Sequence, residues 1–182
     1  MKNIKIFIIS LASYFIFSPS WSDTLTINDL VFRNDLFFEK FNDVPFTGKV
    51  SGKQNGEFKL GLKEGIWKFY YQNGQLERKG TYIYGEKMGV WENYWSNGQL
   101  FRKGRYRKGE KQGIWADYHE NGQTWDKGSY IDGKKEGLWK TYWINGQLYS
   151  KGKYLNGKLE GNWEFYDING KVIFRDTGNY KE

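Results

Sequence analysis

Five tryptophans recur along the chain at one fixed spacing of 24 residues. The same motif surrounds each of them, with a Gly two residues before the tryptophan, a Tyr three residues after it, and an Asn-Gly pair further on. Self-similarity at a fixed period of this size is typical of a repeat array. The chain is therefore expected to form one elongated stack and not a globule with a single pocket. The five residues are Trp67, Trp91, Trp115, Trp139 and Trp163.

Each repeat carries two turn signals about a dozen residues apart. One is the Asn-Gly pair, as in Asn73-Gly74, for which we predict a two-residue type I′ turn because both residue types tolerate positive φ. The other lies near Gly85 and its equivalents, and is clearest at Asp132-Gly133. Strands of roughly seven or eight residues joined by tight hairpins must be antiparallel. The predicted fold is all-β, an elongated single-layer antiparallel meander of β-hairpin repeats.

The burial of this sheet is expected to come from aromatic residues. In the second strand of a hairpin, Leu76, Gly80 and Tyr82 have even spacing and are predicted to share a face. A strand glycine removes a side chain and lets a neighbouring ring lie flat over the backbone. Trp67 and Tyr70 are three residues apart, which puts them on opposite faces of a regular strand. Either both faces carry aromatics, or a bulge brings the two rings together.

The chain divides into three parts. Residues 1–22 have the pattern of a secretory signal peptide: an early pair of lysines, an apolar run over residues 6–17, and Ser20-Trp21-Ser22 as a cleavage site. Cleavage would start the mature, exported chain at Asp23, and the alternative is an uncleaved anchor. Residues 23–64 are expected to form a capping hairpin, with strands at 30–32 and 36–38, and a shortened repeat that includes Asn55-Gly56. Residues 65–182 hold five repeats and a C-terminal cap.

Composition limits the chemistry of the chain. It has 182 residues, a formal net charge of +7 and no cysteine, so disulfides and thiolate metal sites are absent. The single histidine, His119, occupies the slot of Tyr71, Trp95 and Trp143 in the other repeats, which indicates a packing or surface variant. We predict no catalytic residue, no metal site and no cofactor. The basic character is too weak and too interrupted to predict nucleic-acid binding.

The repeats resemble the MORN-repeat variant family (membrane occupation and recognition nexus). The resemblance covers about residues 44–172 and rests on Gly-x-Trp-x-x-Tyr, Asn-Gly-Gln-Leu, Lys-Gly-x-Tyr and Gly-x-Lys-x-Gly. Many bacterial members of this kind are named YwqK-type antitoxins, which implies neutralisation of a toxin partner. Membrane or phosphoinositide binding and protein-interaction scaffolding are further functions that the resemblance implies. It brings no catalytic residues.

Two groups of residues are candidates for partner contact. The strand around Arg102, Lys103, Arg105 and Arg107 is the most basic part of the chain, and alternation puts Arg102 on the face opposite the other three. This strand either contacts lipid headgroups, acidic glycan or an acidic partner, or is a solvated surface balanced by the acidic repeat 113–136. Trp95 and Trp143 share a slot two repeats apart, and either anchor a protein partner or belong to the core.

The function predicted from the sequence is an exported, non-enzymatic scaffold that binds a protein partner through its aromatic-rich β-face. A peripheral module on anionic membrane is the first alternative, held by the basic strand. A toxin-neutralising antitoxin or immunity protein is the second. The sequence does not identify the partner or the oligomeric state.

Overall fold

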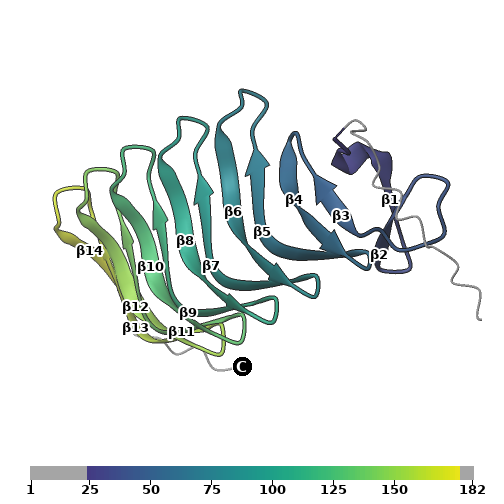
Figure 1. Cartoon of the computed structure of the whole chain (residues 1–182). Helices are drawn as coiled ribbons and strands as arrows, with labels where there is room; N and C mark the ends of the chain where they lie inside the picture. Colours follow the sequence, from purple (N-terminus) through teal and green to yellow (C-terminus); the bar gives the residue numbers. More distant parts are fainter. Residues whose placement is uncertain (1–23, 177–182) are drawn as a thin grey trace, which may run out of the picture.

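A computed structural model describes residues 24–176 and shows an open, single-layer β-sheet (Figure 1). Twelve antiparallel strands, β3 to β14, follow one another in strict chain order, and a separate hairpin, β1–β2, precedes them. The predicted all-β antiparallel meander is confirmed. The strands are β1 (Leu30–Arg33), β2 (Leu36–Glu39), β3 (Gly48–Val50), β4 (Gln54–Lys59), β5 (Leu62–Tyr70), β6 (Leu76–Ile83), β7 (Glu86–Tyr94), β8 (Leu100–Arg107), β9 (Glu110–Tyr118), β10 (Thr124–Ile131), β11 (Lys134–Tyr142), β12 (Leu148–Leu155), β13 (Lys158–Tyr166) and β14 (Val172–Asp176).

Two kinds of turn alternate along the sheet, and the type I′ conformation predicted at Asn-Gly occurs at the other turn. At Asn73-Gly74 only the glycine has positive φ, at 84°, so this is not a type I′ turn. The Asn73 Oδ1 atom instead accepts a hydrogen bond from the Gln75 amide at 3.0 Å. Positive φ at two successive residues occurs in the other turn, where Lys108 and Gly109 have φ of 50° and 77°. The type I′ hairpins therefore link one repeat to the next.

A bulge at the start of each tryptophan strand fixes the direction of the side chains. Gly89 has a φ of 68°, and the register shifts between Lys79 and Thr81 on the facing strand. This places Trp91 over the glycine of the preceding strand. The pairing with β8 shifts register again between Asn93 and Tyr94, and Tyr94 lies on the opposite face, where its hydroxyl donates to Glu92 at 2.8 Å. Both faces of the sheet therefore carry aromatic residues, so the first of the two alternatives is correct.

The core is a ladder of tryptophan rings stacked on glycines. A Cβ atom added at Gly80 would lie 2.1 Å from the Trp91 ring, and four equivalent glycine–tryptophan pairs show the same close approach. Each indole N–H donates to a backbone carbonyl of the strand it covers, as Trp91 does to Thr81 at 3.2 Å. Tyr82 packs edge-on against Trp91, with centroids 5.1 Å apart. The predicted shared face holds for Gly80 and Tyr82. It is wrong for Leu76, which pairs with Tyr70 across a register shift.

The N-terminal hairpin packs against β4, the second strand of the array. The predicted hairpin is present as β1–β2, and a short 3₁₀ helix, η1 (Ile27–Asp29), precedes it with a Thr26–Asp29 capping box. Phe37 of this hairpin packs 4.8 Å from Phe58. The Asn55-Gly56 pair of the shortened repeat does not form a turn like the other Asn-Gly pairs; it lies inside β4, where the Trp67 ring packs on Gly56. No helix among residues 24–176 is long and apolar enough to cross a membrane.

Two parts of the sequence-based prediction lie outside the described residues. These are the signal peptide over residues 1–22 and the end of the C-terminal cap beyond residue 176.

Candidate binding surface

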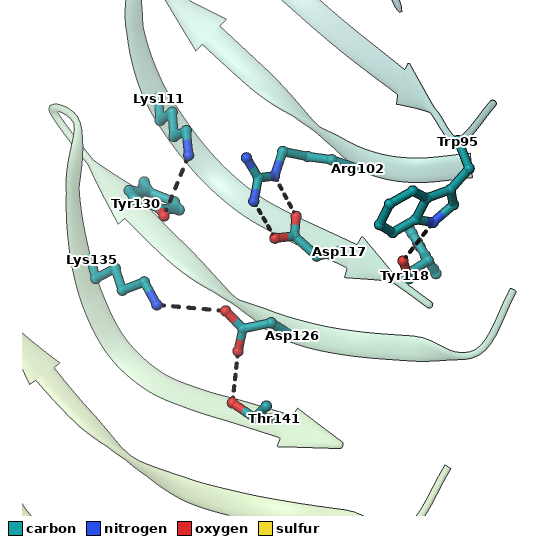
Figure 2. Close-up of polar contacts among 9 residues, drawn as sticks. All are labelled: Trp95, Arg102, Lys111, Asp117, Tyr118, Asp126, Tyr130, Lys135 and Thr141. Atoms are coloured by element: carbon teal, nitrogen blue, oxygen red, sulfur yellow. Dashed lines mark hydrogen bonds and ion pairs between the residues drawn. The ribbon is translucent and has the colours of Figure 1, made fainter. Parts of the chain in front are cut away.

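The slot occupied by Trp95 and Trp143 serves to join successive repeats. The Trp95 indole donates to the Tyr118 carbonyl at 3.1 Å, and Trp143 does the same to Tyr166 (Figure 2 shows the first pair). Tyr71 donates through its hydroxyl to the Tyr94 carbonyl at 2.7 Å. His119 Nε2 lies 3.0 Å from the Tyr142 carbonyl in the same arrangement. Each of the four aromatic residues in this slot thus places a polar ring atom at the carbonyl 23 residues later, whereas the fifth repeat has Asp167 at this position.

This pattern gives Trp95, Trp143 and His119 a structural role. Both tryptophans are half-buried, so part of each ring still reaches the surface. The property that these residues share is a hydrogen-bond donor at the end of an aromatic ring. The sequence contains that signal, since Tyr, Trp, His and Trp all have such a group, but only the structure shows the carbonyl that receives it.

Arg102 lies on the tryptophan face, defined here as the side of the sheet that carries the periodic tryptophans. Its guanidinium binds Asp117 through two hydrogen bonds of 2.7 and 2.5 Å. The bonds to Asp117 raise the pKa of Arg102. Asp126 faces Asp117 across the strands, and accepts a hydrogen bond from Thr141 at 2.9 Å and an ion pair from Lys135 at 3.5 Å. Figure 2 shows Lys111 and Asp117 on the inner side of the curved strand β9.

A series of lysines lies over the tryptophan rings on this same face. The Nζ atom of Lys63 is 4.5 Å from the Trp67 ring centroid, and that of Lys135 is 3.9 Å from Trp139. Lys87 and Lys111 repeat the contact at 4.7 and 4.6 Å. Burial lowers the pKa of Lys63 to about 8, with smaller contributions from nearby cations. These lysines cover the rings, so the tryptophan face presents little bare aromatic surface.

The opposite side of the sheet, the lysine face, carries a cross-strand row rich in lysine. Each strand contributes one residue to this row, and the backbone register places these residues side by side. Glu92 bridges two of the lysines, with distances of 2.9 Å to Lys79 and 2.8 Å to Lys103. Hydrogen bonds from Lys103 and then Lys79 lower the pKa of Glu92 to about 2. The row from β5 to β13 is Lys68, Lys79, Glu92, Lys103, Ala116, Lys127, Lys140, Lys151 and Glu164.

Exposed aliphatic residues form a stripe beside the lysine row. Ile66, Val90, Ile114 and Leu138 are 70%, 45%, 67% and 53% exposed, and each immediately precedes a buried tryptophan. A second set of exposed residues, Ile83, Ile131 and Leu155, lies at the ends of the even-numbered strands on the same face. An aliphatic side chain left exposed in four successive repeats is a feature that ordinary surface composition does not account for.

Shallow depressions separate the members of the aliphatic stripe. One of about 430 Å³ lies between Val90 and Ile114, and Tyr118 and Lys127 contribute to its lining. Another of about 280 Å³ lies between Ile114 and Leu138, beside Lys127 and Lys140. The sequence analysis missed this surface. The available signal was the residue between Gly and Trp in the repeat motif, which is Ile, Val, Ile and Leu in four repeats and Asn162 in the fifth.

The structure separates the residues of the basic strand as alternation predicted. Lys103 lies on the lysine face with Glu92, and Arg105 is exposed opposite Val90 on the same face. Arg107 contacts Asp132 at 3.2 Å with both side chains exposed. Only Arg102 lies on the tryptophan face, where its charge is balanced by Asp117. The acidic repeat therefore compensates two of the four basic residues.

An open meander of 24-residue hairpin units, with a buried aromatic ladder and a patterned outer surface, defines a β-repeat protein. A family model described as MORN repeat variant matches residues 63–84, 89–108, 111–132 and 135–156. The four matched segments coincide with hairpin units of the array, which are therefore similar to MORN repeats. No curated protein matches the chain significantly.

Among solved structures, a chain from a GtfA/B complex bound to UDP and GlcNAc is 12% identical, with a TM-score of 0.21. The alignment covers 91% of this chain and 29% of that chain. This chain therefore spans less than a third of the length of that structure.

Proposed function

We propose that this protein is an exported, non-enzymatic scaffold that binds a protein partner through the lysine face of its sheet. MORN repeats are associated with membrane or protein binding. The observation that carries the choice of face is the aliphatic stripe, exposed in four consecutive repeats. The periodic tryptophans of the other face are 0 to 6% exposed, so they are unavailable as contact residues. Export rests on the pattern of residues 1–22.

A position-specific crosslink tests this function. A photo-crosslinking residue placed at Ile114 is expected to give a discrete product with one protein of the cell envelope. The same residue at Ile144, which is 57% exposed but lies in the turn after β11, is the matched control and is expected to give no such product. Equal products from both positions, or none from Ile114 in folded protein, would reject the lysine face as the binding surface. Finding the chain only in the cytoplasm would reject export.

The second candidate is a peripheral module on anionic membrane. Lys103, Arg105 and Arg107 point away from the tryptophan face and supply the positive charge. Flotation of the full chain with anionic vesicles, lost at high salt and in the Lys103→Gln/Arg105→Gln/Arg107→Gln variant, would support it. Arg102 stays unchanged in this variant because its pair with Asp117 is structural. Absence of flotation at low salt would remove this candidate.

The toxin-neutralising role is a special case of the scaffold function in which the partner is a toxin. A toxin among the products crosslinked at Ile114 would identify it, and a partner of another kind would exclude it.

A further inference from the structure

The lysine face repeats one arrangement along the axis of the array. Four of the five repeats supply an exposed aliphatic residue, and beside it lie a depression and a cation, as with Ile114, Lys127 and the depression before Leu138. The aliphatic residue recurs on every second strand. Neighbouring strands are about 4.8 Å apart, so successive members of the stripe are roughly 10 Å apart. A ligand that uses several of these positions must therefore run across the strands and repeat at this distance.

The charges on this face select an acidic ligand. Within residues 24–176, Arg105, Lys127, Lys140 and Lys153 form no ion pair with an acidic side chain. The two carboxylates of the lysine row are already occupied, since Glu92 is shared by two lysines, and Glu164 contacts Lys151 at 2.9 Å and Arg175 at 3.9 Å. The surface around Ile114 and Leu138 therefore has uncompensated positive charge next to apolar depressions.

The repeat distance selects the conformation of the ligand. A polyproline II segment has three residues per turn and a rise of about 3.1 Å, so every third side chain points the same way about 9.3 Å further on. A β-strand turns its third residue to the opposite face. An α-helix returns side chains to one face after three or four residues, about 5–6 Å, and its match near this distance, seven residues or about 10.5 Å, drifts by about 20° at each step. The polyproline II spacing fits the stripe best.

We propose that the lysine face binds an extended, acidic polypeptide segment in the polyproline II conformation, with an apolar side chain at every third residue. This inference rests on the proposed scaffold function and specifies the chemistry of its partner. The segment lies along the array axis, with apolar residues in the depressions beside Val90, Ile114 and Leu138. Its acidic residues face the lysine row on one flank. Its third column of side chains faces Ile131 and Leu155 on the other flank.

A protein segment accounts for this surface better than a membrane does. The aliphatic residues are separate, about 10 Å apart, and Lys127 lines both depressions that flank Ile114. A bilayer would favour a continuous apolar patch with cations at its border. A membrane therefore enters the test as the competing outcome.

Synthetic peptides test this proposal directly with the purified full chain. The probe is a labelled peptide of four Leu-Pro-Glu units, and the control peptide has the same residues in shuffled order. We expect the probe alone to bind, with an affinity that falls at high salt. Ile114→Ser should weaken binding about tenfold, because one buried aliphatic side chain contributes roughly that factor. Ile144→Ser, which changes an exposed isoleucine in a turn, should leave the affinity unchanged.

A second variant separates charge from apolar contact. Lys127→Gln/Lys140→Gln removes two unpaired cations and should weaken binding while reducing its dependence on salt. Equal binding of the shuffled peptide, or of the probe to Ile114→Ser, would overturn the proposal. The proposal would also be overturned if the chain bound anionic vesicles but not the probe, and if Ile114→Ser abolished the vesicle binding.

The crosslinking experiment distinguishes failure of the proposed ligand chemistry from failure of the proposed scaffold function. If the probe fails while the Ile114-specific crosslink persists, the scaffold function stands and the proposed ligand chemistry is wrong. If the crosslink is also absent, the proposed function itself fails.

Discussion

At the scale of single residues, the fold depends on glycines that leave room for aromatic rings. Gly104 lies in β8 where the pairing with β9 shifts register between Lys103 and Arg105, its φ is not positive, and the Trp115 ring lies close against it. A methyl group there would be 2.1 Å from the ring carbon Cδ2. Because Trp115 is also held by its hydrogen bond to the Arg105 carbonyl, the ring has no free direction in which to move.

Gly104→Ala is therefore expected to lower the free energy of unfolding by about 3 kcal/mol, at the upper end of overpacking effects. Gly113→Ala is the matched control, because a Cβ atom there would meet no atom within 4 Å and only the backbone strain of its φ of 67° opposes it. That strain should cost roughly 1 kcal/mol. Denaturant unfolding of both variants measures the difference. Equal losses would show that the glycine–tryptophan contact is not what constrains Gly104.

A second residue-scale prediction concerns His119. His119→Phe keeps an aromatic ring but removes the group that contacts the Tyr142 carbonyl. We expect a loss of about 1 kcal/mol in unfolding free energy, the usual net contribution of one hydrogen bond. His119→Trp should restore the stability, since Trp95 and Trp143 make this bond from the same slot. If Phe and Trp were equally stable, the donor would be irrelevant and only ring packing would matter.

At the scale of elements, the sequence predicts the positions of strands and turns but not the turn types. The Asn-Gly pairs occur where one hairpin turn lies, yet the Asn73 side chain caps the Gln75 amide and keeps its own φ negative. The true type I′ turns include Tyr84-Gly85 and Lys108-Gly109, whose first residues give no local signal for positive φ. Cross-strand pairing imposes that conformation, and a single sequence does not display it.

The first repeat shows a related limit. Gly56 and Phe58 lie 24 residues before Gly80 and Tyr82, so the period was present in the sequence. The adjacent Asn55 suggested a turn instead. What distinguishes the two interpretations is the Trp67 ring over Gly56, which is a contact between strands.

Glu92 connects three strands and gives the sheet a predictable response to acid. Its folded pKa of about 2 is below the reference value of 4.5, so its contribution is complete above pH 4.5 and is lost as the pH falls toward 2. Because its lysine partners are partly exposed, we expect Glu92→Gln to cost only about 1 kcal/mol at neutral pH. This cost should shrink to zero between pH 4.5 and about 2. Unfolding measured across this range, with exposed Glu120→Gln as control, checks it. A cost independent of pH would contradict the ionic role.

At the scale of the whole molecule, the array is a linear series of similar units. From β3 to β14 each strand is hydrogen-bonded to the next in chain order. The glycine–tryptophan pairs extend one core along this sheet. Stability in such a chain is close to a sum over repeats and their interfaces. The sequence predicts this architecture well because the period determines it. It did not predict the aliphatic stripe, because a side chain's exposure on the lysine face depends on the bulge that orients the neighbouring tryptophan.

Removal of one whole period tests this description. Deletion of residues 137–160 joins Glu136 to Gly161, in the same sequence context that Glu136 and Gly137 have now. Trp163 then takes the place of Trp139 over Gly128, and Phe165 replaces Thr141 opposite Asp126. The Arg102–Asp117 pair is untouched. We expect a folded, shorter sheet that unfolds cooperatively, with a smaller denaturant m-value because less surface is exposed on unfolding.

Deletion of residues 137–148 is the contrasting variant, because it removes half a period. Strands that carry a periodic tryptophan then no longer alternate with strands that carry the glycine beneath it. Tyr149 would then follow Glu136, and no tryptophan would reach Gly128. This variant should lose much more stability than the longer deletion, although it removes fewer residues. Circular dichroism during urea unfolding compares the two. If the shorter deletion were the more stable, chain length and not the repeat register would determine the fold.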